Sequence, residues 1–165
     1  MRSRARRGRP ETGASAVEFA LVVPLLVMLL LGVTAAGIGL SNALGTTDAV
    51  REGARFGATT LVTPAPTGYG TWSAAVQAKT VALSDGSLTA TSEVCVKLQK
   101  GTSTVVQQSS CTFTANEPPN PTSLQATDCI VKVWAKIPVE INIGVASWNI
   151  DVIRGSVAHY ERTCS

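Results

Sequence analysis

A single uninterrupted apolar stretch dominates the pattern of hydrophobic and polar positions in this chain. From Phe19 to Leu40 no residue carries a charge, which makes a run of 22 residues. At 1.5 Å per residue, a helix of that length reaches roughly 33 Å, about the thickness of the hydrocarbon core of a bilayer. The pattern therefore predicts a membrane-spanning helix close to the N-terminus.

After this run the pattern changes to a narrow apolar stripe. Small and apolar residues recur at intervals of four and three, at Ala43, Thr47, Val50, Ala54, Gly57 and Leu61. This spacing puts them on one side of a helix that packs on a sheet. The charged residues between them fall on other faces, which we interpret as solvated: Asp48, Arg51, Glu52 and Arg55. We expect the helix to continue until Pro64 and Pro66 end it.

A shorter helix and a hairpin are predicted next. A mixed apolar face between Tyr69 and Asp85 predicts a second helix. Apolar and polar residues then alternate from Leu88 to Leu98, which indicates a strand. The turn sequence K-G-T around Gly101 would connect this strand to a partner strand from Val105 to Phe113.

The remaining chain also carries strand signals. Alternation resumes from Cys129 to Ile137, we expect Pro138 to interrupt it, and a last strand from about Ile150 to Tyr160 would close the sheet. The predicted fold class is α+β. It comprises a long N-terminal transmembrane helix continuing into an amphipathic helix, a short second helix, and a C-terminal antiparallel β-sheet of three to five strands.

The basic residues are concentrated at the N-terminus. The formal net charge is +3, and five arginines lie in the first nine residues: Arg2, Arg4, Arg6, Arg7 and Arg9. Residues 14–165 hold nine basic and ten acidic residues, so they lack the basic face of a nucleic-acid-binding protein. The positive-inside rule places the N-terminus in the cytoplasm and the body of the chain outside.

Export affects the interpretation of the cysteines. The four cysteines, Cys95, Cys111, Cys129 and Cys164, all follow the apolar run. Without a C-x-x-C pair, and with His159 as the single histidine, a zinc site is poorly supplied. In an oxidising compartment these residues predict two disulfides. Three connectivities are possible, and we favour Cys95–Cys111 because both residues lie near strands joined by a short turn.

The residues before the apolar run form a recognisable motif. Residues 13–19 read G-A-S-A-V-E-F, directly after the basic leader. This order resembles the processing site of type IV prepilins and pseudopilins. Together with D-A-V-R-E-G-A-R-F-G-A at residues 48–58, it resembles more narrowly the TadE-like family of tight-adherence (Flp) pilus systems. The resemblance covers about residues 10–60, and it departs from the family at Val50, where alanine is commoner.

The resemblance implies roles for individual residues. A prepilin peptidase in the membrane would cut after Gly13, and Ala14 would become the new N-terminus. Glu18, with its aromatic neighbour Phe19, would then act in assembly. The implied partners are the peptidase, other pilin and pseudopilin subunits, the pilus assembly platform and the lipid bilayer, with no cofactor and no metal.

These roles divide the chain into three parts. Residues 1–13 would be a cleaved leader, residues 14–41 a transmembrane helix, and residues 42–165 an extracytoplasmic pilin-like domain. The expected location is the cytoplasmic membrane, crossed once, or a surface pilus.

Two other interpretations remain open. The basic leader and apolar run also fit a secretory signal cut near Ala35, which would release a secreted disulfide-bonded module. The chain also fits an unprocessed single-pass membrane protein with an extracytoplasmic binding domain, in which Glu18 is an interfacial carboxylate. The N-terminus of the mature chain distinguishes them, since it would be Ala14, near Ala36, or Met1.

Enzyme motifs are absent from the sequence. It contains no G-x-S-x-G, P-loop or H-E-x-x-H motif, so we do not expect an enzyme. We interpret His159 as a surface residue, and we expect Trp134 and Trp148 to pack in the sheet rather than to stack on a ligand.

Overall fold

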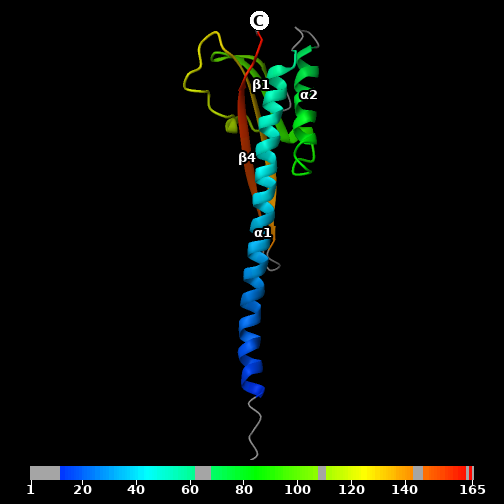
Figure 1. Ribbon diagram of the computed structural model, residues 1–165, viewed down its shortest axis with the longest axis vertical. Helices are drawn as coiled ribbons and strands as arrows, with labels where there is room; N and C mark the ends of the chain where they lie inside the picture. The colour runs from blue at the N-terminus through cyan, green and yellow to red at the C-terminus, as the bar shows by residue number, and fades with distance from the viewer. Residues whose placement is uncertain (1–11, 62–67, 108–110, 143–146, 163, 165) are drawn as a thin grey trace, which may run out of the picture.

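A long helix forms the axis of the molecule, and a smaller α+β unit packs along its C-terminal half (Figure 1). The computed structural model describes residues 12–61, 68–107, 111–142, 147–162 and 164. Helix α1 (Thr12–Thr59) is one α-helix of 48 residues that continues through Pro24. Its N-terminal half extends away from the remaining elements (Figure 1). We call residues 15–34 the rod, and the described residues from 41 onward the head.

The second helix, α2 (Gly68–Ala82), packs closely against the C-terminal half of α1. A side chain at Gly53 would overlap the hydroxyl of Thr80, and one at Gly57 would lie 3.1 Å from the Val76 methyl group. The indole Nε1 of Trp72 also donates a hydrogen bond to the Gly57 carbonyl, at 3.1 Å. The two glycines therefore allow the helices to approach at a distance that larger residues would prevent.

A four-stranded antiparallel sheet completes the head, in the order β2-β1-β3-β4. Its strands are β1 (Val94–Lys100), β2 (Ser103–Gln107), β3 (Cys129–Asn142) and β4 (Ser147–His159). The central strand β3 pairs Val133 with Val96 on one side and with Ser156 on the other. This arrangement confirms the predicted α+β class.

The sheet is covered on both faces. Alternate residues of β1 and β3 face the helices and form the core with α1 and α2: Val94, Val96, Leu98, Val131, Val133, Ala135 and Ile137. On the opposite face, the indole of Trp134 donates a hydrogen bond to the carbonyl of Phe113, at 3.2 Å. A Cβ at Gly155 would lie 3.2 Å from Pro118. The connection from residue 111 to 128 thus forms a third layer, and β3 is buried on both sides.

The first hairpin is shorter than its alternation predicted. β1 begins at Val94 rather than Leu88, because a 3₁₀ turn (Thr91–Glu93) precedes it. The carboxylate of Glu93 accepts backbone hydrogen bonds from Thr89 and Ala90, at 2.7 and 3.1 Å. These local bonds hold the backbone out of the ladder.

The partner strand also ends early. β2 is described as far as Gln107, and the strand does not reach Phe113, because Cys111 is joined to Cys95 and the chain then turns into a 3₁₀ helix (Thr114–Asn116). The crosslink draws this part of the chain across the face of the sheet.

We predicted that Pro138 would interrupt the third strand, and this prediction is wrong. β3 continues through it to Asn142, where Pro138 is paired with Asp151 of β4. The pairing with β1 ends at Ala135, so Pro138 lies where β3 has a neighbour on one side only. Proline is tolerated at such an edge because a missing N–H leaves no ladder bond unmade. β4 accordingly begins at Ser147, earlier than the predicted Ile150.

The two helices end slightly earlier than predicted. α1 ends at Thr59, so Leu61 lies beyond it and is 56% exposed rather than on the buried stripe. Pro64 and Pro66, which we expected to end α1, lie outside the described residues. α2 ends at Ala82, three residues before the predicted Asp85.

Candidate functional site

The predicted processing position lies in the first turn of α1, just before the rod. Gly13 is in the first turn of α1, where it is exposed, and no described residue packs within 4 Å of the position a Cβ would take. Ala14 follows in the same turn, while the basic leader before residue 12 lies outside the described residues. The peptide bond after Gly13 is therefore not enclosed by the head. That it is cleaved stays a prediction.

Glu18 and Phe19 are also exposed on the rod. Phe19 has 71% of its surface exposed, and Glu18 forms no ion pair with any other residue that the structure describes. On a helix, Glu18 lies about 6 Å along the axis from Ala14, roughly one turn. A carboxylate next to apolar surface, without an ion-pair partner among the residues that the structure describes, favours a partner from elsewhere. Its role in assembly stays a prediction.

The rod itself has no protein cover. Within α1, an 18-residue window has a mean hydropathy of 2.6, and none of it is buried. The exposed side chains include Leu21, Leu25, Leu26, Met28, Leu29, Leu30 and Val33. So large an apolar surface requires lipid or other apolar helices around it. This helix, which is long and apolar enough to cross a bilayer, indicates a single-pass membrane protein.

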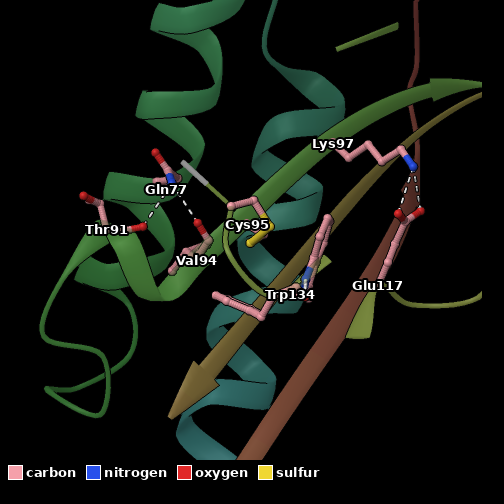
Figure 2. Close-up of a disulfide and its surroundings, with 9 residues drawn as sticks. Gln77, Thr91, Val94, Cys95, Lys97, Glu117 and Trp134 are labelled. Carbon is pink, nitrogen blue, oxygen red and sulfur yellow. Dashed lines mark hydrogen bonds and ion pairs between the residues drawn. A yellow bond between two sulfur atoms is a disulfide. The ribbon is translucent and has the colours of Figure 1, made fainter. Parts of the chain in front are cut away.

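Two disulfides join distant parts of the head. Cys95 is linked to Cys111, with 5.2 Å between the Cα atoms, and Cys129 is linked to Cys164 at 6.0 Å. The predicted pairing Cys95–Cys111 is confirmed, and it ties β1 to the third layer (Figure 2). The second disulfide holds the C-terminal end of the chain at the start of β3.

The C-terminal end also contacts the end of α1. The amide of Glu161 donates a hydrogen bond to the carbonyl of Ala58, at 3.2 Å, and the hydroxyl of Tyr160 donates to the carbonyl of Thr60, at 3.3 Å. Together with the Cys129–Cys164 disulfide, these bonds hold the C-terminal residues against the last turn of α1.

A group of three charges holds the third layer against the sheet. The carboxylate of Glu117 accepts hydrogen bonds from Lys97 at 2.8 Å and from Lys132 at 2.7 Å, and the Lys132 side chain is only 3% exposed. Figure 2 shows the pair of Lys97 and Glu117 beside the sheet. Burial raises the pKa of Glu117, but the hydrogen bonds from Lys132 and Lys97 outweigh it, so the net pKa lies below 4.5. This group explains why lysine is tolerated inside the protein.

A buried glutamine connects α2 to the start of β1. The side-chain amide of Gln77 donates hydrogen bonds to the carbonyl of Thr91 at 3.0 Å and to that of Val94 at 2.7 Å (Figure 2). These bonds satisfy backbone groups where the strand begins, and they are a structural feature of the head.

The other charged residues and the histidine named from the sequence do not gather into a catalytic or metal site in the part of the chain that the structure describes. Asp48, Arg51, Glu52 and Arg55 are all exposed, with Asp48 and Arg51 3.7 Å apart, which confirms a solvated face. His159 is exposed. Within the described ranges, no group of three histidine, cysteine or acidic residues could hold a metal ion.

The two tryptophans of the sheet differ. Trp134 is fully buried, as predicted, whereas Trp148 is 52% exposed, so the prediction that it packs in the sheet is wrong. Trp148 lies at the hairpin end of β4, where the paired strands run alongside α1.

Gly53 is one of the structural residues that the sequence interpretation overlooked. It follows Glu52 in the R-E-G-A-R segment and lies one helical turn before Gly57. Two glycines four residues apart inside a helix lower its stability by roughly 1 kcal/mol each relative to alanine. Because their spacing puts both glycines on one face of the helix, this loss of stability could have indicated a close contact with another helix.

Comparison with known proteins gives one family. The TadE family, described as TadE-like protein, matches residues 13–55, about a quarter of the chain. No curated protein and no solved structure matches. The matched segment runs from the predicted processing position, through the rod, to the part of α1 that includes Gly53. Residues 13–55 of this chain are therefore similar to the TadE-like family.

Proposed function

We propose that this chain is a minor pilin or pseudopilin that is processed after Gly13 and takes part in assembling a Tad (Flp) pilus. The observation that carries the proposal is the rod, an apolar helix of membrane-spanning length that its own head leaves uncovered. Such a helix suits a subunit that leaves the bilayer by exchanging lipid for the helices of other subunits.

Processing would prepare the rod for this exchange. The five arginines of the leader hold it at the cytoplasmic face, and a cut after Gly13 removes them. The cut also creates an α-amino group on Ala14, whose ordinary pKa of about 8 leaves it mostly protonated at neutral pH. The new positive charge then lies about one turn from Glu18.

Glu18 would act after cleavage, during assembly. Between stacked subunits, the carboxylate of one Glu18 can pair with the amine of a neighbour's Ala14. In an environment of low dielectric such a pair is sensitive to position, so it favours one axial register between rods. The partners in this scheme are a prepilin peptidase, other pilin subunits and the assembly platform. The N-terminus faces the cytoplasm, and the head faces outward.

Two variants separate processing from assembly. With a matching prepilin peptidase co-expressed, Gly13→Leu should retain the 13-residue leader, while Glu18→Gln should be cut like the wild type. Processed Glu18→Gln should still be extracted with the membrane fraction, but should recover at least tenfold less major pilin in a pull-down. Glu18→Asp should be intermediate, because its shorter side chain displaces the charge.

The readouts are the intact mass of the membrane-extracted protein, the pull-down and a count of pili. If the wild-type chain stays full length beside an active peptidase, the pseudopilin assignment is wrong. Equal pilin recovery and equal piliation by Glu18→Gln would leave Glu18 as a tolerated interfacial carboxylate.

A further inference from the structure

The end of the β3–β4 hairpin lies beside the apolar run of α1. A Cβ at Gly57 would lie 3.1 Å from Val131, and one at Gly39 would lie 3.4 Å from Val139. From Val131 to Val139 the strand advances about 26 Å, and from Gly57 back to Gly39 the helix covers about 27 Å. β3 therefore runs alongside α1 toward the rod over this whole length, as Figure 1 shows for β4 as well.

The facing surfaces of the hairpin and helix are apolar but do not close on each other. Between them lies a groove of about 210 Å³, lined by Ala35, Ala36, Gly39, Val139, Ile150 and Val152. The small side chains of α1 at this level leave the groove open. Ile150 is accordingly 50% exposed, although its strand faces the helix.

Trp148 extends this apolar face beyond the groove. Because side chains alternate along a strand, Trp148 lies on the same face of β4 as Ile150 and Val152. It is 52% exposed, whereas Trp72 and Trp134 are 3% and 0% exposed. The opposite face of the hairpin carries an ion pair between Lys136 and Asp151, at 2.6 Å. The hairpin end thus has one apolar face and one polar face.

The position of the apolar run in α1 shows where the apolar face of the hairpin would lie relative to a bilayer. Glu18 is the last charged residue before the run, and about 20 helical residues cross the hydrocarbon core, which places its far boundary near Ile38. The groove lies at this boundary. Trp148 is about 7 Å farther along the strand than Ile150, so it lies within about 5 Å of the boundary. Tryptophan is enriched at this depth because its ring is apolar and its N–H is polar.

We propose that the apolar end of the β3–β4 hairpin, formed by Trp148 and Ile150, is immersed in the membrane interface on the side away from Glu18. Phospholipid would fill the groove, and the head would hold the bilayer at a second point besides α1. This inference rests on the membrane-spanning placement of the rod in the proposed function.

Lipid is the occupant because the apolar surface is continuous. Val33, Ile38 and Leu40 flank the groove on α1 and are 60–65% exposed. The lipid that surrounds these side chains can therefore also contact Ile150 and Trp148, because the surface between them is apolar. The Lys136–Asp151 pair, on the other face, remains toward water and headgroups.

The test uses the tryptophan fluorescence of the full-length protein in phosphatidylcholine–phosphatidylglycerol vesicles at high lipid excess. Lipids brominated near the top of the acyl chain quench indoles in the interface, and aqueous iodide quenches indoles in water. We expect bromolipid to remove the emission of Trp148 and iodide to leave it. In Trp148→Phe, which retains the two buried tryptophans, the bromolipid-dependent loss should disappear.

A matched control places the tryptophan far from the bilayer. In Leu61→Trp combined with Trp148→Phe, the indole lies beyond the end of α1, roughly 32 Å along the axis from Leu40. It should be quenched by iodide and not by bromolipid. If Trp148 of the wild type behaves like this control, or is shielded from both quenchers, the inference is overturned.

Flotation with the vesicles separates this inference from the proposed function. A wild-type chain that does not float disproves the membrane placement and both proposals with it. A chain that floats while iodide reaches Trp148 disproves only the hairpin contact.

Discussion

The two halves of α1 belong to one helix but have opposite side-chain arrangements. In the rod the large residues are exposed, as with Leu29 at 60%. Along the head the small residues are buried, with Ala54 at 0% and Gly53 and Gly57 also inside. The rod needs apolar area to contact lipid or neighbouring helices, whereas the other half must let α2 and the sheet come close.

This difference shows where the stability of the chain originates. Substitutions in the head change contacts that the chain makes with itself, so they alter its free energy of unfolding. Substitutions in the rod change contacts with lipid or with neighbouring helices, so they should leave that free energy unchanged. The following predictions test this separation, beginning with the largest effect.

The Cys129–Cys164 disulfide should contribute most to the stability of the head. Removing it, as Cys129→Ala with Cys164→Ala, should cost about 4 kcal/mol, because the bridge spans 35 residues. In detergent, thermal unfolding followed by near-ultraviolet circular dichroism should shift down by about 10 °C. The helical signal of the rod should persist beyond this transition.

The other disulfide is the matched comparison. Replacing Cys95 and Cys111 by alanine opens a loop of 16 residues and should cost about 3 kcal/mol. A larger shift for this pair would mean that the third layer, rather than the C-terminal closure, limits the stability of the head.

Glu117 should be the next most sensitive position. Glu117→Gln leaves the buried Lys132 ammonium without its counter-charge and should cost about 3 kcal/mol at neutral pH. Because the pKa of Glu117 is lower in the folded state than 4.5, its contribution is complete above about pH 4.5. It is lost as the pH falls through the folded-state pKa.

Denaturant unfolding from pH 7 to 3 checks this sign. The difference in free energy of unfolding between the wild type and Glu117→Gln should be constant at high pH and should become smaller in acid. Asp48→Asn is the control, because the Asp48–Arg51 pair is exposed and should contribute under 1 kcal/mol. A difference that becomes larger in acid would contradict the stabilising role of the carboxylate.

The glycines of α1 provide the most direct comparison between its halves. Gly53→Ala should cost about 2 kcal/mol, because the added methyl group overlaps Thr80. Gly37→Ala, where nothing lies within 4 Å, should leave the unfolding of the head unchanged. Adding Thr80→Ala to Gly53→Ala should restore part of the loss. Equal unfolding midpoints for the two single variants would show that α2 can move aside.

The sequence alone was sufficient where a structural property is local. The apolar run predicted the long helix because length and hydropathy belong to a contiguous segment. Cys95 and Cys111 were paired correctly because a short turn lies between their neighbouring strands. The motif from Gly13 to Phe19 indicated the TadE-like family for a similar reason, since its residues are read in order along one helix.

Properties that depend on distant neighbours were decided only by the tertiary structure. Pro138 fits within β3 because β1 ends before it, which no local pattern reports. The residues from 111 to 128 cover the sheet because Lys132 and Lys97, on two different strands, converge on Glu117. Trp148 alternates like a core residue, yet it is half exposed because the hairpin extends past α2 to a part of α1 that is lined by alanine and glycine. Burial is set by which elements meet in space, so the same alternation gave a buried Trp134 and an exposed Trp148.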